Sequence, residues 1–297
     1  MKVLITGING FVGQYLKKHL LSAGCDVFGI DRHSHDKDTF ETDITDRDKL
    51  GGIIKDIRPE EIYHLAGIAD VAHGNVSDYY TVHAIGTLNL YEAVQKADID
   101  PKILYVSTSN VYGIVPEEKQ PITEAQPVRP VNHYGASKAA GEMISHKYIA
   151  DGLRIIIARS FNHTGPGQTE SFILPKLAKA FAEKQPEIGL GDTHTKRDFT
   201  DVRDVVKAYR MIVQEAGAGE VYNVCSGAVY SIDDMLGYLR NITGHAIRIR
   251  QMASLKRTVD PVLFAGDNRR LKKLGWSASI PIEQTIKDLI GFYNEQT

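Results

Sequence analysis

The stretch Lys2-Val3-Leu4-Ile5-Thr6-Gly7-Ile8-Asn9-Gly10-Phe11-Val12-Gly13 decides the fold of this chain. A short apolar run leads directly into three glycines, and an apolar helical period then continues to Ala23. In a strand–loop–helix unit the first glycine permits a tight turn, the second lets the backbone approach a diphosphate, and the third lets the helix pack close to the sheet. The helix N-terminus, with its unpaired N–H groups, favours the anion. The predicted dinucleotide-binding residues of this loop are Gly7, Asn9, Gly10, Phe11, Val12 and Gly13.

An acidic residue follows the expected second strand, Asp26–Ile30. The carboxylate of Asp31 is placed to accept hydrogen bonds from an adenosine ribose, and it would repel a 2′-phosphate. The sequence therefore favours NAD(H) over NADP(H). Arg32 is an alternative partner for that phosphate, so NADP(H) stays open. Further along, Asp43 and Ile44 are expected to contact the edge of the adenine.

Apolar runs alternate with helical periods in the first half of the chain, which predicts an α/β fold of the Rossmann type with a doubly wound parallel sheet. The expected strands are Lys2–Thr6, Asp26–Ile30, Glu61–Leu65, Ile103–Ser107 and Arg154–Ala158, and the expected helices are Phe11–Ala23, Asp46–Ile57, Tyr79–Ala97 and Tyr134–Ile149. The fifth strand is nearly all aliphatic, as in a strand that is covered on both faces.

The alternation weakens after about Phe161, where Gly165-Pro166-Gly167 interrupts the pattern. We therefore expect residues 1–165 to bind the dinucleotide, and residues 166–297 to form a smaller mixed α/β lobe for the substrate, interleaved with the sheet. In this second part we expect a strand at Ile247–Gln251 and helices at Phe172–Lys184, Val202–Glu215, Ser231–Thr243 and Ile282–Tyr293.

The overall composition excludes several classes of protein. The 297 residues include 35 Lys and Arg against 37 Asp and Glu, without the basic surplus of a nucleic-acid binder. Two cysteines make no disulfide framework, and no Cys/His spacing suggests a metal site. No apolar run is long enough to span a bilayer or to follow a basic end as in a signal peptide. We expect a soluble cytoplasmic protein that needs no metal, nucleic acid or membrane.

Tyr134 and Lys138 are one helical turn apart and so share a helix face. A phenol has an ordinary pKa near 10, which makes it a poor proton-transfer group at neutral pH. A nearby ammonium and a cationic nicotinamide would lower that pKa. Tyr134 is then expected to exchange a proton with a carbonyl or carbinol oxygen during hydride transfer. A tyrosine and a lysine at this spacing occur by chance in many helices. The dinucleotide-binding loop that precedes them in this chain favours a catalytic role for the pair.

Four motifs together resemble the extended short-chain dehydrogenase/reductase family, in the branch that acts on nucleotide-diphosphate sugars. They are the glycine loop 7–13, His64-Leu65-Ala66-Gly67, Ser107-Thr108-Ser109-Asn110-Val111-Tyr112-Gly113, and Tyr134 with Lys138. The resemblance implies that Leu65, Ala66 and Gly67 line the cofactor and that Lys138 holds the nicotinamide ribose. It also implies that Thr108 hydrogen-bonds the sugar C4 oxygen together with Tyr134, with Ser109 and Asn110 beside the substrate.

The residues after Thr108 discriminate between the reactions of this family. Dehydratases of the family carry carboxylates there for the C5 proton and the leaving hydroxyl, whereas this chain has Ser109 and Asn110. The type that combines 3,5-epimerisation with reduction uses a cysteine near this loop, and this chain has none there. Hydride transfer at C4 remains, either in a reductase or in a 4-epimerase that retains its NAD.

Stretches of the second half resemble reductases of GDP-linked 4-keto-6-deoxyhexoses, namely 159–168, 197–204, 221–227 and 269–276. That resemblance implies diphosphate contacts for Asn162, Arg197 and Arg257, and a nucleoside contact for Asp260. Guanidinium donors suit phosphate oxygens. The chain departs from the pattern at Asn110, where such reductases often have Glu, and at His83, where the family usually has Asn. A dTDP- or UDP-linked substrate therefore stays open.

The function implied by the resemblance is NAD(P)H-dependent reduction of the C4 keto group of a nucleotide-diphosphate 4-keto-6-deoxyhexose. Members of the family pair through two helices into a four-helix interface, so a homodimer is expected through 79–97 and 134–149. Both helices carry enough apolar residues to cover more than one face, namely Leu88, Leu90, Val94, Met143, Ile144 and Tyr148.

Overall fold

A computed structural model describes residues 1–34, 36–71, 74–253 and 261–296. Arg257 and Asp260, which the sequence analysis assigns to the substrate, lie outside these described residues. Within the described ranges no helix combines the length and the apolar character that are needed to cross a bilayer.

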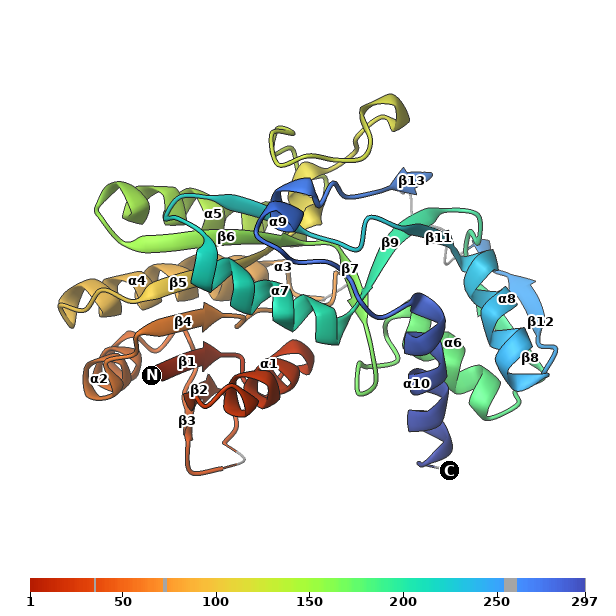
Figure 1. The fold of residues 1–297 in the computed structure, drawn as a ribbon, viewed down its shortest axis with the longest axis horizontal. Coiled ribbons are helices and arrows are strands. Elements are labelled where there is room, and N and C mark those ends of the chain that lie inside the picture. The colour runs from red at the N-terminus through yellow and green to blue at the C-terminus, as the bar shows by residue number, and fades with distance from the viewer. Residues whose placement is uncertain (35, 72–73, 254–260, 297) are drawn as a thin grey trace.

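A seven-stranded parallel sheet forms the centre of the molecule, with strand order β10-β6-β5-β4-β1-β2-β3 (Figure 1). Its strands are β1 Lys2–Thr6, β2 Asp26–Asp31, β3 Thr39–Glu41, β4 Glu61–His64, β5 Lys102–Thr108, β6 Arg154–Ser160 and β10 Val221–Val224. Strands β1, β4, β5 and β6 are almost entirely buried, as the aliphatic runs of the sequence indicate. The expected doubly wound Rossmann-type fold is confirmed.

Helices cover both faces of this sheet, and each face has its own apolar core. On one face lie α1 Phe11–Ser22 and α7 Val202–Glu215. On the other face lie α2 Arg47–Ile57, α4 Gly86–Lys96 and α5 His133–Ala150. In Figure 1 the helices α1 and α7 lie in front of the strands, on the side of the viewer.

The prediction of a single helix over Tyr79–Ala97 is wrong in detail. The segment consists of α3 Val76–Tyr80, a π-helical turn at Thr81–Ile85, and α4. The π turn centres on His83, whose ring is buried and bonded at both nitrogens to residues outside the turn. A π turn accommodates an extra residue in a helix, and such turns are frequent at functional sites.

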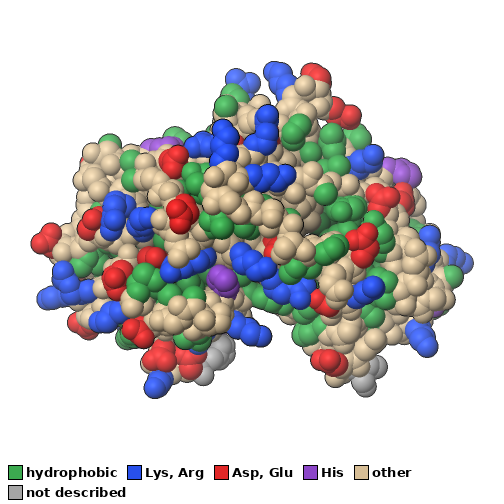
Figure 2. Space-filling view, viewed as in Figure 1, with side chains coloured by type: hydrophobic (Ala, Val, Ile, Leu, Met, Phe, Trp, Pro, Cys, Tyr) green, Lys and Arg blue, Asp and Glu red, His purple; other side chains and the backbone are tan. Residues whose placement is uncertain are grey.

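The second part of the chain forms a lobe beyond the carboxyl ends of the sheet strands (Figure 1). Its core is built by α6 Ile173–Ala182, α8 Ile232–Thr243 and α10 Ile282–Asn294. The remaining elements there are β7 Asn162–Thr164, β8 Glu187–Leu190, β9 Lys196–Asp201, β11 Val229–Ser231, β12 Arg248–Gln251, β13 Leu263–Phe264 and α9 Arg269–Lys273. From the lobe the chain returns to the central sheet once through the consecutive elements α7 and β10. It returns a second time through α9, whose Leu271 packs in the core beside β10. Figure 2 shows the surface hollowed between the two parts.

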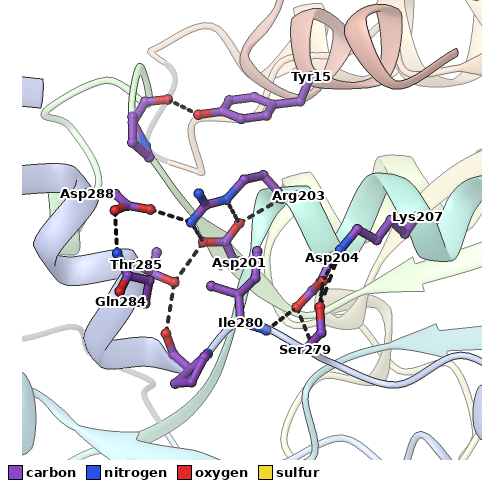
Figure 3. Close-up of polar contacts among 12 residues, drawn as sticks. Tyr15, Asp201, Arg203, Asp204, Lys207, Ser279, Ile280, Gln284, Thr285 and Asp288 are labelled. Atoms are coloured by element: carbon purple, nitrogen blue, oxygen red, sulfur yellow. Dashed lines mark hydrogen bonds and ion pairs between the residues drawn. The ribbon is translucent and has the colours of Figure 1, made fainter. Parts of the chain in front are cut away.

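Buried carboxylates tie the lobe to the sheet (Figure 3). Asp201 caps α7, and its second oxygen accepts a hydrogen bond of 2.7 Å from Thr285 on α10. The guanidinium of Arg203 bridges Asp201 at 2.7 Å and Asp288 of α10 at 2.6 Å. Because the carboxylate of Asp201 is fully buried, its partners fix the angle between α7 and α10.

Three of the six apolar residues named on the two helices expected at a dimer interface are used inside this one chain. Leu90 and Val94 are fully buried, and Tyr148 is only 5% exposed in the core between the sheet and α4. These three residues therefore serve the face that covers the sheet, which is one of the faces that the apolar residues of these helices are expected to cover. The homodimer stays a prediction. Met143, with 54% of its surface exposed, and Ile85, with 48%, remain available on this side.

An ion pair fixes helix α5 to the sheet. Glu142 on α5 is fully buried and pairs with Arg159 of β6 at 2.6 Å. Ser107 of β5 donates a further hydrogen bond of 2.5 Å to the same carboxylate. All three groups lie in a low-dielectric interior, where each depends on the others for compensation.

Arg159→Met should therefore destabilise the protein strongly, because it leaves the Glu142 carboxylate buried without its cation. We expect a loss of about 3–5 kcal/mol in the free energy of unfolding, measured by urea denaturation. In the double variant Arg159→Met/Glu142→Leu both charges are gone, and most of the loss should be recovered. A single variant that loses less than about 1 kcal/mol, the level of an exposed pair, would contradict this view.

Candidate active site

The glycine loop between β1 and α1 has the geometry of an anion cradle. Gly7 has φ of +75°, a conformation that side chains disfavour. A Cβ added at Gly13 would lie 2.3 Å from the carbonyl oxygen of Gly7, so that only glycine lets α1 begin here. Gly10 caps α1 without a side-chain hydrogen bond, and the first turn, which includes Phe11 and Val12, carries no acidic residue. These residues therefore fit the diphosphate of a dinucleotide.

Asp31 ends β2 beside this loop. One of its oxygens accepts the Asn9 N–H at 3.0 Å and the other accepts the Arg32 N–H at 2.8 Å. Arg32 is exposed. Asp43 instead bonds the N–H and hydroxyl of Thr45, and Ile44 is buried against Gly86.

The segment after β4 lies next to Lys138. A Cβ at Gly67 would lie 2.9 Å from Nε2 of His83 and 3.2 Å from Nζ of Lys138. Ala66 donates its N–H to the Thr6 hydroxyl at 3.1 Å, and Leu65 packs against the core on the α1 side. The structure therefore brings the predicted segment 65–67 and the predicted lysine together.

Tyr134 stands in the first turn of α5 and meets Thr108 at the end of β5. The Thr108 hydroxyl is the polar side chain that acts on the phenol, and the phenol ring packs against the rings of Tyr79 and His83 at centroid distances of 6.2 and 5.8 Å. Burial raises the pKa of the Tyr134 phenol, and the bond with Thr108 opposes that rise.

The expected lowering of the Tyr134 pKa by Lys138 together with a cationic nicotinamide stays a prediction. The ammonium of Lys138 donates to the carbonyl oxygen of Val106 at 3.0 Å. Burial lowers the pKa of Lys138 to about 8, against the raising effect of Glu142. The pKa of the buried amine is therefore close to neutral pH. The amine is directed to the end of β5 by its bond with Val106.

Two buried histidines surround this pair, and sequence reasoning assigned neither a firm role. Thr87 donates its proton to the carbonyl of His83, so its oxygen accepts from Nε2 of His64 at 2.9 Å. Nδ1 of His64 then accepts the Thr6 hydroxyl at 2.7 Å. In the sequence His64 is marked by its place at the end of an apolar strand, as the first residue of the motif His64-Leu65-Ala66-Gly67.

His83 is fixed in the opposite tautomer. Its Nε2 accepts the Ile68 N–H at 2.9 Å, so its Nδ1 carries the proton and donates to Ser137 at 2.8 Å. Ser137 in turn donates to the carbonyl of Tyr134 at 2.8 Å. Burial, with a smaller contribution from Lys138, lowers the pKa of His64 to about 3 and of His83 to about 2.

The predicted substrate residues of the second part lie on neighbouring strands. Asn162 of β7 pairs in parallel with Phe199 of β9, two residues beyond Arg197. Because side chains alternate along a strand, Asn162 and Arg197 face the same side of this small sheet. Asn162 is exposed and Arg197 is half-buried, while Ser109 beside Thr108 is almost fully buried.

A parallel sheet with a glycine cradle at its first turn, and a Tyr-x-x-x-Lys helix at its carboxyl edge, defines the extended short-chain dehydrogenase/reductases. The chain belongs to the family described as "GDP-mannose 4,6 dehydratase", whose sequence model matches residues 4–289. The expected resemblance to this superfamily is confirmed.

Two curated relatives and two solved structures give the family context. GDP-6-deoxy-D-mannose reductase of Pseudomonas aeruginosa is 32% identical and covers 97% of this chain and 96% of its own length. GDP-6-deoxy-D-talose 4-dehydrogenase of Aggregatibacter actinomycetemcomitans is 32% identical over 91% of this chain and 90% of its own length.

The structure of RMD from Pseudomonas aeruginosa, complexed with NADPH, superposes with a TM-score of 0.89 at 31% identity, covering 100% of this chain and 99% of that one. UDP-glucose 4-epimerase of Thermus thermophilus, complexed with NAD, has a TM-score of 0.89 at 25% identity and covers 100% of both chains. The chain is therefore an NAD(P)-dependent oxidoreductase, as the sequence predicts.

Both buried histidines should stay neutral from pH 6 to 8, His64 with its proton on Nε2 and His83 on Nδ1. Two-bond ¹H–¹⁵N correlation spectra of ¹⁵N-histidine-labelled protein report the tautomer directly, and the variants His64→Asn and His83→Asn assign the two signals. The unfolded chain takes up protons below the ordinary histidine value of 6.5, which the folded chain does not. Stability should therefore fall as the pH drops below that value. A cationic ring at pH 6, or the reverse tautomer, would contradict the assignment.

Proposed function

We propose that this protein reduces the C4 keto group of a GDP-linked 4-keto-6-deoxyhexose with NAD(P)H, giving a GDP-6-deoxyhexose. The observation that carries the proposal is the hydroxyl pair of Thr108 and Tyr134 at the sheet edge, flanked by Ser109 and Asn110 instead of carboxylates. Hydroxyls protonate an oxygen, whereas eliminating water across C5–C6 requires a carboxylate acid and base at that position. Both curated relatives have names that refer to GDP-6-deoxy sugars, which supports the same substrate class.

In the proposed mechanism Tyr134 is the proton donor to the ketone oxygen. The reduced nicotinamide, when bound, supplies the hydride for the carbonyl carbon. Thr108 directs its hydroxyl proton at the oxygens of this step, which are those of the ketone and of Tyr134. It thereby stabilises the negative charge that develops on them. Lys138, which lies beside Gly67, holds the cofactor ribose and contributes positive charge below its pKa of about 8.

The second part of the chain, residues 166–297, is the proposed substrate lobe, together with Asn162 at its border. Asn162 and Arg197 share one face of the β7/β9 sheet, and a guanidinium beside an amide suits a diphosphate. The assignments of Arg257 to the diphosphate and of Asp260 to the nucleoside stay predictions.

A second candidate function is a 4-epimerase that retains its NAD, on the evidence of the likeness to the NAD complex of a UDP-glucose 4-epimerase. The same Tyr134 and Thr108 would serve that reaction. The two candidates differ in cofactor balance: a reductase consumes one NAD(P)H per ketosugar, while an epimerase leaves the absorbance at 340 nm unchanged and purifies with bound NAD. The same assay with a dTDP- or UDP-linked sugar tests which nucleotide base the enzyme accepts.

We further propose that the enzyme works in the cytoplasm, where the reduced cofactor is supplied, and as a homodimer. The exposed side chains of Ile85 and Met143, on the face formed by the π turn and α5, are the apolar groups proposed to meet the partner.

NADH is the proposed cofactor in preference to NADPH, because the Asp31 carboxylate ends β2 beside the glycine loop. The ratio of kcat/KM for NADH to that for NADPH should exceed one. In Asp31→Ser that ratio should fall by about tenfold or more, since about 1.4 kcal/mol of charge repulsion is removed from a 2′-phosphate. Arg32→Ser serves as the control, since it should lower NADPH use only. A wild-type preference for NADPH would refute the assignment. The test is demanding because the similar structure of RMD from Pseudomonas aeruginosa is a complex with NADPH.

Tyr134→Phe should reduce kcat by about 10²–10⁴-fold, because the variant lacks the proton donor. The dissociation constant for the nicotinamide cofactor, measured by quenching of protein fluorescence, should stay within about threefold of wild type because the phenol contributes no cofactor anchor in this mechanism. Near-normal turnover of the ketosugar by this variant would overturn the mechanism.

A further inference from the structure

Asn110 links the strand end that carries Thr108 to the helix that carries Tyr134. It lies in a short 3₁₀ turn, Ser109–Tyr112, which follows β5 directly. This turn touches the start of α5 so closely that a Cβ at Gly135 would lie 2.6 Å from the Asn110 carbonyl oxygen. The missing side chain at Gly135 therefore sets the distance between Asn110 and the tyrosine helix.

A backbone group determines how the nearby amides are oriented. The N–H of Gly135 donates to the side chain of Asn132 at 2.7 Å, and the accepting atom must be Oδ1 because a backbone N–H only donates. The Nδ2 group of Asn132 consequently faces the other way and donates to Oδ1 of Asn110 at 3.2 Å. The Nδ2 group of Asn110 is thereby directed at Thr108.

Thr108 accepts two hydrogen bonds from Asn110. Its Oγ1 receives the backbone N–H at 3.2 Å and the Nδ2 group at 3.1 Å. A hydroxyl has two lone pairs and one proton, so both lone pairs of Thr108 are occupied and only its proton remains to be shared. Toward the phenolic oxygen of Tyr134, Thr108 can therefore act only as a donor, in agreement with its lowering effect on the pKa of that phenol.

We propose that Asn110 is a positioning residue that makes the Thr108 hydroxyl a donor only, and so reserves the Tyr134 proton for the substrate oxygen. Hydrogen bonds run in one direction from Gly135 through Asn132 and Asn110 to Thr108, whose remaining proton is left for the Tyr134 phenol. In the reduction, the carbonyl carbon accepts the hydride and its oxygen accepts the Tyr134 proton. The resulting phenolate keeps the Thr108 proton as its hydrogen-bond donor until solvent reprotonates it. The inference rests on the proposed function for this last step.

Two single-atom exchanges should reverse the chain of hydrogen bonds without changing side-chain size. Asn110→Asp keeps the bond from Asn132 but places an acceptor toward Thr108, which then donates away from Tyr134 and accepts its proton. Asn132→Asp keeps the cap on Gly135 but places an acceptor toward Asn110, so the Asn110 amide turns over and presents its oxygen to Thr108. The second exchange reaches Tyr134 only through two intervening side chains.

We expect kcat to fall about 100-fold in each Asp variant, within the range that a positioned proton donor contributes, with KM for the ketosugar changed by less than about threefold. Asn132→Ser is the matched control, because serine caps a helix as well as asparagine does but offers Asn110 no strong acceptor. The kcat of Asn132→Ser should be at least about ten times that of Asn132→Asp. The reason is that only the reversed series of hydrogen bonds in the Asp variant takes up the Tyr134 proton.

A measurement without cofactor or substrate separates this inference from the proposed function. In protein labelled with ¹³Cζ-tyrosine, Tyr134→Phe identifies the Tyr134 signal. That signal should move in the same direction in both Asp variants, since the phenol changes from acceptor to donor toward Thr108, and should move less in Asn132→Ser. Wild-type kcat in either Asp variant, an unmoved Tyr134 signal, or an Asn132→Ser variant as impaired as Asn132→Asp would overturn the inference. If the wild-type protein reduces no ketosugar, the proposed function fails while the labelled-tyrosine result still decides the direction of the chain.

Discussion

The buried pair of Glu142 and Arg159 is the interaction on which the site depends. Helix α5 carries Tyr134 and Lys138, and it must lie at one height and rotation against β5 and β6 for either to act. A pair of charges that is almost completely buried has only one favourable arrangement. Apolar contacts, in contrast, tolerate small displacements of the helix along the sheet. The same carboxylate also sets the electrostatics, because its charge supports the buried ammonium of Lys138 one turn away.

Polar groups behind the tyrosine are satisfied by neutral partners. His64 and His83 occupy places where a charged ring would face the Lys138 ammonium in a dry environment, and burial keeps both uncharged. Their tautomers follow from backbone groups that can act in only one way. Asn132, Asn110 and Thr108 obey the same logic on the other side of Tyr134. Fixed donors and acceptors of this kind are arranged before the substrate arrives, which is how a site stabilises developing charge.

Local sequence signals predicted the first half of the fold well. The glycines of the first loop, the aliphatic strands and the helix of Tyr134 each follow from short-range rules of turns, periodicity and capping, and their ends agree within a few residues. The short strands β7, β11 and β13 escaped prediction because two or three residues carry no period and are defined by their pairing with β9. The π turn around His83 escaped for a related reason, since its cause is a pair of bonds to Ile68 and Ser137 outside the helix.

The sequence by itself determined the chemistry available: a glycine cradle, an acid at the end of the second strand, and a tyrosine and lysine on one helix face. These are properties of neighbours along the chain. Only the tertiary structure decided which apolar residues are left for a partner, where the Lys138 ammonium points, and which way each hydroxyl and amide near Tyr134 donates. The physical reason is that burial and hydrogen-bond direction depend on groups far apart in sequence. Asn132, Asn110 and Thr108 acquire a common direction only when α5 packs against the end of β5.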